Sequence, residues 1–291
     1  MTGVIRLASG ADEAEVDTLG AEAVALRVDG KALLWKADPA IWHRTSPVLF
    51  PIVGRVRNGK LSIGGRSYPI GVHGFAATSR FEVVRRSDDA LLLRLADDGA
   101  MRESFPYSFR LDVGYRLISC GLAVTFQVDN PGVDFLPYAL GLHPAFAWPF
   151  SGGGRSGYRI EFEREERADV PVITPDGLFS RVRRLVPIDG LTLRLTDALL
   201  AHEALCFLDA RSRSVRFVAP DGAAIRMGME NFPHVALWSQ PCAPFLSIEA
   251  WTGHGDPDGF DGDISVKPSM RFLAPGASAR HSIRLTYEAG S

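Results

Sequence analysis

The sequence predicts an all-β protein, folded as a large antiparallel β-sandwich or barrel. Three observations support this prediction. Apolar and polar residues alternate with period 2 along much of the chain, and tight-turn residues separate the alternating runs. Convincing helical patterns are almost absent, and the chain lacks the strand–helix–strand rhythm that a parallel sheet requires.

The predicted strands come mostly in hairpins whose turns carry Gly, Asp or Ser. In chain order the hairpins are residues 24–35 around Asp29-Gly30, 60–70 around Gly64-Gly65, 81–95 around Ser87-Asp88-Asp89, 109–130 around Ser119-Cys120-Gly121, and 214–229 around Asp221-Gly222. Near the C-terminus, one more strand places Ile283, Leu285 and Tyr287 on one face, with Arg284 and Thr286 on the other. One short helix is predicted over residues 196–205, with Thr196 or Asp197 as its N-cap.

Length and composition limit the classes of protein to which the chain can belong. The chain has 291 residues, 46% hydrophobic and 23% charged, and no linker divides it, so we expect a single domain over residues 1–291. The formal net charge of −2 gives no reason to expect nucleic acid or an anionic membrane as a partner. No apolar run reaches the roughly 18 residues of a membrane helix, and the N-terminus lacks the pattern of a signal peptide.

The three cysteines, Cys120, Cys206 and Cys242, are far apart and odd in number. This spacing argues against a disulfide framework and against a zinc site, and it suits a reducing cytoplasm. We therefore expect a cytoplasmic protein without a metal. The sequence leaves open whether the chain is a monomer or a homodimer paired along a sheet edge.

Two candidate functional residues lie in glycine-punctuated stretches of the first third of the chain. Arg55 follows Gly54 and an apolar run, where its guanidinium could donate hydrogen bonds to substrate oxygens. His73 lies between Gly71 and Gly74, which allow a ligand to approach the backbone closely. Taken alone, each residue is also compatible with an ordinary surface or loop position.

Two more candidates lie in apolar surroundings further along. His143 is the one histidine within the stretch "YALGLHPAFAWPF", where Phe146 and Trp148 supply flat apolar surface that suits a sugar ring or a core equally. Glu249 ends a strand-like apolar run beside Trp251, and desolvation there would raise the pKa of its carboxyl, as a general base near neutral pH needs. Together, two histidines, an arginine and a glutamate predict acid–base chemistry on a polyhydroxylated ligand.

Other chemistries lack their usual motifs. The acidic string Asp256, Asp258, Asp261 and Asp263 does not follow the EF-hand order, so we interpret it as a solvated loop. The chain has no H-E-x-x-H, P-loop, G-x-S-x-G or G-x-G-x-x-G sequence, which removes the support for metallopeptidase, NTPase, α/β-hydrolase and dinucleotide-binding functions.

The candidate residues also lie in segments that resemble those of the aldose 1-epimerases, the galactose mutarotase-like family, and most closely its bacterial LacX-like branch. The matching segments are "WKADPAIWHRTSPVLFPIVGRVRNGKLSIGGRSYPIGVHGFA", "LGLHPAF", "FPHVALWSQPCAPFLSIEAWTG" and "DGDISVKPSMRFLAPGAS". They keep the same order from about Trp35 to Ser278 and so cover most of the chain. The resemblance implies a β-supersandwich with an open carbohydrate cleft and catalysis that needs no cofactor.

The resemblance also implies roles for individual residues. His143 corresponds to the general acid and Glu249 to the general base, while Arg55 and His73 correspond to ligands of the substrate hydroxyls and ring oxygen. An acidic residue precedes the "FP" of "MENFPHVALWS" in relatives, which makes Glu230 a further substrate-binding candidate, and Trp251 beside Glu249 is another. His143 must hold a proton while Glu249 does not, so we expect a nearby carboxylate to offset the effect of the apolar wall.

Two departures from the family pattern bear on the substrate. Ala250 replaces the proline that relatives often carry between Glu249 and Trp251, with little expected consequence. Ala77 stands where relatives commonly have a basic residue, which weakens a hexose-6-phosphate 1-epimerase function, although Arg57, Lys60 and Arg80 are nearby in the sequence. The alternatives to a mutarotase of free aldoses are therefore a hexose-6-phosphate 1-epimerase and a non-catalytic carbohydrate-binding or sensing protein.

Overall fold

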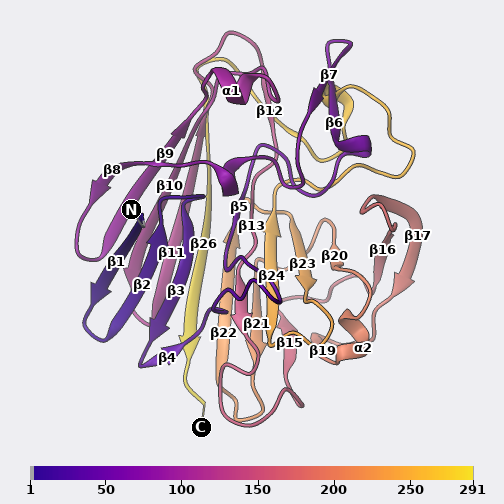
Figure 1. Cartoon of the computed structure of the whole chain (residues 1–291). Helices are drawn as coiled ribbons and strands as arrows, with labels where there is room; N and C mark the ends of the chain where they lie inside the picture. The colour runs from indigo at the N-terminus through magenta and orange to yellow at the C-terminus, as the bar shows by residue number, and fades with distance from the viewer. Residues whose placement is uncertain (1–2, 291) are drawn as a thin grey trace.

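The computed structural model describes residues 3–290 and consists mainly of antiparallel sheets (Figure 1). The largest sheet has ten strands in the order β18-β19-β15-β21-β22-β26-β11-β10-β9-β8. In that order the strands are β18 Ile188–Asp189, β19 Thr192–Arg194, β15 Arg159–Phe162, β21 Ser214–Val218, β22 Ala224–Glu230, β26 Ser278–Glu288, β11 Gly121–Asp129, β10 Arg110–Ile118, β9 Ala90–Ala96 and β8 Glu82–Arg86.

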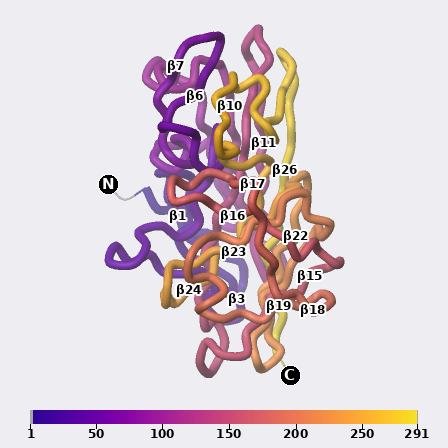
Figure 2. The backbone as a smooth tube through the Cα atoms, turned by 90° about the vertical axis from the view of Figure 1, so that its right-hand side faces the viewer, coloured from indigo at the N-terminus to yellow at the C-terminus, as the bar shows by residue number. Residues whose placement is uncertain are grey.

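Two smaller sheets lie against one face of this large sheet and form the second layer of the sandwich (Figures 1 and 2). A four-stranded sheet consists of β1 Val4–Ser9, β2 Asp12–Asp17, β3 Glu22–Val28 and β4 Lys31–Ala32. A six-stranded sheet consists of β20 Leu205–Phe207, β23 His234–Trp238, β24 Phe245–Trp251, β13 Gly141–Leu142 and β5 Val48–Leu49, with β14 Ala145–Ala147 also paired to β24.

The remaining elements are short. Three two-stranded ribbons are β12 Leu136–Tyr138 with β25 Arg271–Leu273, β16 Asp169–Ile173 with β17 Phe179–Leu185, and β6 Lys60–Ile63 with β7 Arg66–Pro69. The helical segments are α1 Gly99–Arg102, α2 Asp197–Leu200 and the 3₁₀ turns η1 Arg57–Gly59, η2 Ala76–Thr78 and η3 Ile264–Val266. In the part of the chain that the structure describes, no helix is both long enough and apolar enough to cross a membrane.

The structure confirms the predicted fold class and hairpins. β3 and β4, β6 and β7, β8 and β9, β10 and β11, and β21 and β22 each pair across the predicted turn. In β26, Ile283, Leu285 and Tyr287 are buried on one face, because a strand points alternate side chains to opposite sides of the sheet. The helix predicted over residues 196–205 was too long. Only α2 is helical, capped by the Thr196 side chain, because the chain must then turn to enter the buried strand β20.

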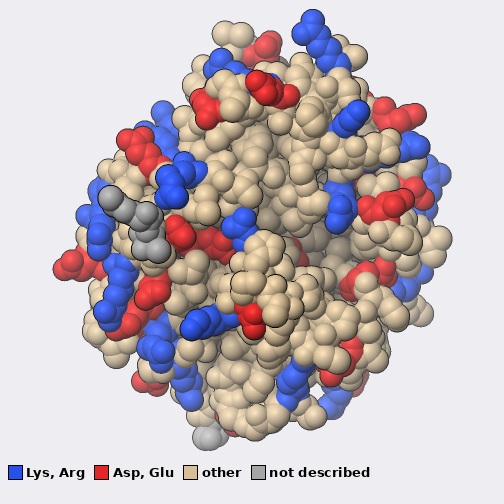
Figure 3. Space-filling model, in the orientation of Figure 1, with Lys and Arg blue, Asp and Glu red and all other residues tan. Residues whose placement is uncertain are grey.

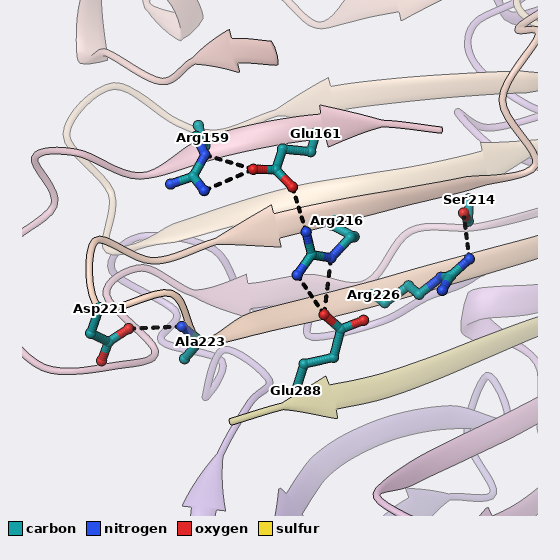
Figure 4. Close-up of polar contacts among 8 residues, drawn as sticks. All are labelled: Arg159, Glu161, Ser214, Arg216, Asp221, Ala223, Arg226 and Glu288. Carbon is teal, nitrogen blue, oxygen red and sulfur yellow. Dashed lines mark hydrogen bonds and ion pairs between the residues drawn. The ribbon is translucent and has the colours of Figure 1, made fainter. Parts of the chain in front are cut away.

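The outer face of the ten-stranded sheet is covered by charged side chains that neutralise one another (Figure 4). Arg159 on β15 contacts Glu161 on the same strand, and Arg216 on β21 contacts both Glu161 and Glu288 of β26. Such exposed pairs contribute little stability, about 0–1 kcal/mol each, but they keep this face polar.

Candidate functional site

Strand β24 carries the centre of the candidate site. Ser247, Glu249 and Trp251 point to one face of the six-stranded sheet, away from the ten-stranded sheet, because they are two residues apart. Leu246, Ile248 and Ala250, which alternate with them along the strand, point into the core between the layers.

The neighbouring strand β23 leaves room above the glutamate. Its small Ala236 is the register partner of Glu249 and points to the same face of the sheet. Figure 3 shows this side of the molecule hollowed over the six-stranded sheet, with acidic atoms visible inside the hollow. The face of β24 that carries Glu249 is therefore the floor of a cleft.

His143 reaches Glu249 from the link between β13 and β14. Both of these short strands pair with β24, and Pro144 joins them in an extended backbone, which places His143 beside the glutamate. The His143 Nε2 atom lies 3.2 Å from Glu249 Oε1, and both side chains are buried. The structure thus brings together the histidine and the glutamate that the sequence indicated.

Each member of this pair has a hydrogen-bond partner on its far side. His143 Nδ1 lies 2.9 Å from the Ser247 hydroxyl, and the indole N–H of Trp251 donates to Glu249 Oε2 at 3.0 Å. Neither partner is ionisable, so neither adds a charge to the pair. Strand β24 therefore supplies the carboxylate together with one orienting group for each member of the pair.

Burial controls the protonation of the pair. It raises the pKa of Glu249 well above its ordinary value, partly opposed by the Trp251 hydrogen bond, and it lowers the pKa of His143 well below 6.5, with a smaller electrostatic effect of the neighbouring His73 in the same direction. The further carboxylate that we expected to offset this effect is not among the groups that contact His143 in the described residues, and the Nδ1 atom of His143 contacts the Ser247 hydroxyl instead. One proton shared by the pair leaves no net charge in the buried site, whereas adding or removing a proton would bury a charge.

His73 faces the pair as a neutral hydrogen-bond donor. It has a left-handed backbone conformation with φ +63°, and its Nδ1 accepts a hydrogen bond of 3.0 Å from the Gly54 N–H. Burial, together with the charge of Arg55, lowers the pKa of His73 to about 4. The imidazole therefore keeps its proton on Nε2 at neutral pH, with its ring 5.9 Å from the ring of His143 and nearly perpendicular to it.

Arg55 stands at the rim of the cleft. Its side chain is exposed, and its aliphatic part lies so close to Gly177, in the β16–β17 turn, that a Cβ there would be 2.4 Å from Arg55 Cδ. Its carbonyl accepts a hydrogen bond from the Asp256 N–H, which ties the arginine to the loop that follows β24. Arg55 is near enough to His73 to lower the pKa of that imidazole.

Aromatic side chains form the wall beside His143, but they are not the ones that the sequence suggested. The rings of Trp42 and Trp238 lie 5.0 and 5.4 Å from the imidazole, and both tryptophans are partly exposed. Phe146 and Trp148, by contrast, are buried in the core at 0% and 1% exposure. Sequence reasoning missed Trp42 because it lies in an irregular loop, where no periodicity reports which way a side chain points.

Comparisons with known proteins agree with this geometry. A family model described as aldose 1-epimerase matches residues 3–285. The chain belongs to the aldose 1-epimerase family. The family consists of isomerases that act on sugars, and the relation covers nearly the whole chain.

Individual relatives support the same assignment. Protein LacX, plasmid, of Lactococcus lactis subsp. lactis is 28% identical over 281 residues, which cover 92% of this chain and 94% of LacX. A galactose mutarotase related enzyme from Lactobacillus acidophilus has a TM-score of 0.92 at 28% identity, covering 99% of this chain and 98% of its own. A galactose mutarotase-like protein from Lactobacillus casei ATCC 334 also has a TM-score of 0.92, at 26% identity, covering 98% of this chain and all of its own.

Glu230 does not join the site of this epimerase-family chain. It is exposed at the end of β22 in the ten-stranded sheet and accepts a hydrogen bond from Ser282 on β26. Met227 and Met229 of the same strand are buried, so Glu230 points to the opposite, outer face. That alternation was readable in the sequence and would have placed Glu230 away from the cleft.

Trp251 lies in the site, but its polar atom is already used. The tryptophan is 5% exposed and its N–H is bonded to Glu249, so it orients the carboxylate and offers no free donor to a ligand. The substrate-binding role expected for Trp251 stays a prediction, limited to contact through the ring.

The acidic string after β24 is only partly a solvated loop. Asp258 and Asp261 are exposed, but Asp256 is buried, contacts Lys267 Nζ at 2.7 Å and accepts a hydrogen bond from the Arg57 N–H. Among residues 3–290, no group of three or more His, Cys, Asp or Glu side chains could hold a metal ion. The Asp256–Lys267 pair instead fixes the loop that supports Arg55.

The basic residues near Ala77 in the sequence are not gathered around the cleft. Arg80 donates a hydrogen bond to Thr18, which lies between β2 and β3. Arg57 and Lys60 line a depression beside the β6–β7 ribbon that also contains Asp256 and Asp261. These positions do not form a cluster of positive charge next to the His143–Glu249 pair.

Proposed function

We propose that this chain is an aldose 1-epimerase that interconverts the α and β anomers of a free hexose by general acid–base catalysis. The observation that carries the proposal is the 3.2 Å contact between His143 Nε2 and Glu249 Oε1 in a buried, aromatic-walled site. Ring opening requires one proton to leave the anomeric hydroxyl and one to reach the ring oxygen. Because both oxygens are bound to the same carbon, the acid and the base must lie next to each other.

The reaction uses the one proton that the pair shares. Glu249, ionised, takes the proton from the anomeric hydroxyl while His143, protonated at Nε2, gives one to the ring oxygen, and the bond between the anomeric carbon and the ring oxygen breaks. The product is an open-chain aldehyde beside a neutral His143 and a protonated Glu249. Rotation about C1–C2 presents the other carbonyl face, and the reverse proton transfers close the ring as the other anomer. The pair keeps one proton throughout.

The surrounding residues have supporting roles. His73 offers an Nε2–H donor that is neutral, so it can bind a sugar oxygen without adding positive charge beside His143. Arg55 at the rim can donate to hydroxyls. Trp42 and Trp238 present apolar surface to the C–H face of the sugar ring.

The placement of charges favours a free sugar over a phosphorylated one. A hexose 6-phosphate would need a cluster of basic side chains, and Arg57, Lys60 and Arg80 lie in other surroundings. A non-catalytic sugar-binding function is disfavoured because it would not need an adjacent, buried acid and base.

A polarimetric assay tests the proposal. We expect the protein to accelerate the mutarotation of α-glucose or α-galactose, and to act more weakly on glucose 6-phosphate in a coupled assay. Preferred action on the phosphate would indicate the hexose-6-phosphate epimerase instead. Sugar binding without acceleration of any of the three would identify a non-catalytic binding protein and refute the enzyme.

The pH dependence of kcat/KM should be flat through neutral pH. Burial lowers the pKa of His143 and raises that of Glu249, so the singly protonated pair persists between the two. Activity should fall only below the ordinary histidine pKa of 6.5, where a second proton enters, and again above the raised pKa of Glu249, where the last proton leaves. A pH–rate profile of kcat/KM, corrected for the uncatalysed reaction, measures this. A half-point at the ordinary histidine pKa would contradict the buried, coupled pair.

A further inference from the structure

The buried and half-buried histidines of residues 3–290 differ in what contacts their Nδ1 atoms. In His73 and His234 a backbone N–H donates to Nδ1, from Gly54 and Asp209 respectively. In His254 and His281 the Nδ1 partner is a backbone carbonyl, of Gly255 and Asn231 respectively. In His143 the partner is a side-chain hydroxyl, that of Ser247.

These partners allow different protonation states. A backbone N–H can only donate, so it requires a lone pair on Nδ1 and opposes the doubly protonated imidazolium. His73 is therefore fixed as an Nε2–H donor and cannot carry a proton through a reaction cycle. A hydroxyl can accept a hydrogen bond from Nδ1–H, which leaves Nε2 free to gain and lose the proton that faces Glu249.

We propose that Ser247 is the positioning residue that makes His143, and not the adjacent His73, the proton carrier of the site. Its hydroxyl accepts from Nδ1–H, holds the imidazole ring with Nε2 toward Glu249, and so selects the nitrogen that exchanges protons. The serine adds no charge of its own, unlike a carboxylate in the same position, which would hold the imidazole permanently protonated. The kinetic part of this inference rests on the proposed function; the part about protonation does not.

The position of Ser247 supports this role. The side chain is completely buried, and its register partner across the strand pair is Ala145, two residues beyond His143. An alanine at position 247 would leave Nδ1–H without an acceptor where water does not reach, so both the imidazolium and the Nδ1–H tautomer would become less favourable. The imidazole would then prefer to carry its proton on Nε2, donated to the Glu249 carboxylate.

Three variants test the inference by kinetics. Ser247→Ala should lower kcat roughly 10-fold or more with little change in KM, an effect comparable to that of losing the hydrogen-bond partner behind a metal-bound imidazole. The acid limb of its pH–rate profile should move to lower pH, because His143 becomes harder to protonate. Ser247→Thr keeps the hydroxyl and should restore the wild-type acid limb. Ser212→Ala removes another buried hydroxyl, one bonded to the Arg164 backbone, and should leave kcat and the profile unchanged.

A spectroscopic measurement keeps the inference independent of turnover. Nitrogen-15 NMR of the imidazoles should show His143 protonated at Nδ1 in the wild type and shifted toward Nε2 protonation in Ser247→Ala, with His73 and His234 protonated at Nε2 in both. If no sugar is turned over, the proposed function fails while the NMR result still decides this inference. An unchanged His143 tautomer in a folded Ser247→Ala protein would overturn it, and so would a wild-type kcat and pH profile in an otherwise active enzyme.

Discussion

Replacement of Glu249 by glutamine should lower kcat for anomer interconversion by about 10²–10⁴-fold, the usual contribution of a positioned base. The amide keeps the shape of the side chain, and its oxygen can still accept from the Trp251 N–H. It cannot take a proton from the anomeric hydroxyl. His143→Asn should lose activity to a similar degree, because the amide cannot deliver a proton to the ring oxygen. Polarimetry under saturating sugar measures both effects.

A matched control is available on the outer face of the molecule. Glu161→Gln makes the same chemical change in a carboxylate paired with Arg159 and Arg216, on the side of the ten-stranded sheet that carries the exposed ion pairs (Figure 4). Its kcat should equal that of the wild type. Near-normal turnover of Glu249→Gln would refute the role of Glu249 as the base, and near-normal turnover of His143→Asn would refute that of His143 as the acid.

Stability should move in the opposite direction to activity in Glu249→Gln. A carboxyl whose pKa is raised on folding stabilises the folded state below its unfolded pKa, and this contribution is lost as the pH rises through the folded pKa. As the pH rises from the unfolded toward the folded pKa of Glu249, this site therefore costs the fold increasing stability, and a neutral amide removes that cost. Thermal unfolding of the variant should give a Tm equal to or above that of the wild type. A large fall in Tm would attribute the lost activity to misfolding.

The alternation of residues predicted much of the fold, because a strand with one buried face shows that face directly. β26 is an example: its predicted apolar face is the face buried in the core. The turns were equally readable, since Asp29-Gly30 and Gly64-Gly65 have the positive φ angles that such turns require. Local signals of this kind survive in the folded protein because tertiary packing agrees with them.

The contents of the cleft were harder to predict, because neighbouring apolar residues do not reveal which layer they face. Phe146 and Trp148 stand beside His143 in the chain but point into the core, whereas Trp42 and Trp238 come from distant segments. Ser247 carried no signal in the sequence, since its importance depends on the register between β14 and β24. Pairing between strands far apart in the chain is set by the whole sandwich and not by any local pattern.

The backbone that holds His73 and Arg55 depends on Gly54. This glycine has φ +77°, its N–H donates to His73 Nδ1, and its carbonyl accepts from the His73 N–H. A Cβ at this position would lie 2.8 Å from the backbone N and Cα of Gly255. Because the opposing atoms are main chain, they cannot rotate away, and the two loops would have to separate.

Gly54→Ala should therefore be strongly destabilising and should also impair the site. We expect a loss of about 2–5 kcal/mol in the free energy of unfolding, from the left-handed backbone, about 1–2 kcal/mol, and the steric overlap, about 1–3 kcal/mol. Gly64→Ala is the matched control, because Gly64 has φ +56° in the β6–β7 turn but no atom within 4 Å of the place that a Cβ would take. It should lose only the backbone part and keep full activity. Urea unfolding of both variants separates the backbone contribution from the steric contribution. Equal losses would show that the approach of Gly54 to Gly255 does not constrain the fold.

Under conditions where Gly54→Ala remains folded, kcat/KM should still be reduced, because the variant displaces the hydrogen bond that fixes His73 as an Nε2–H donor.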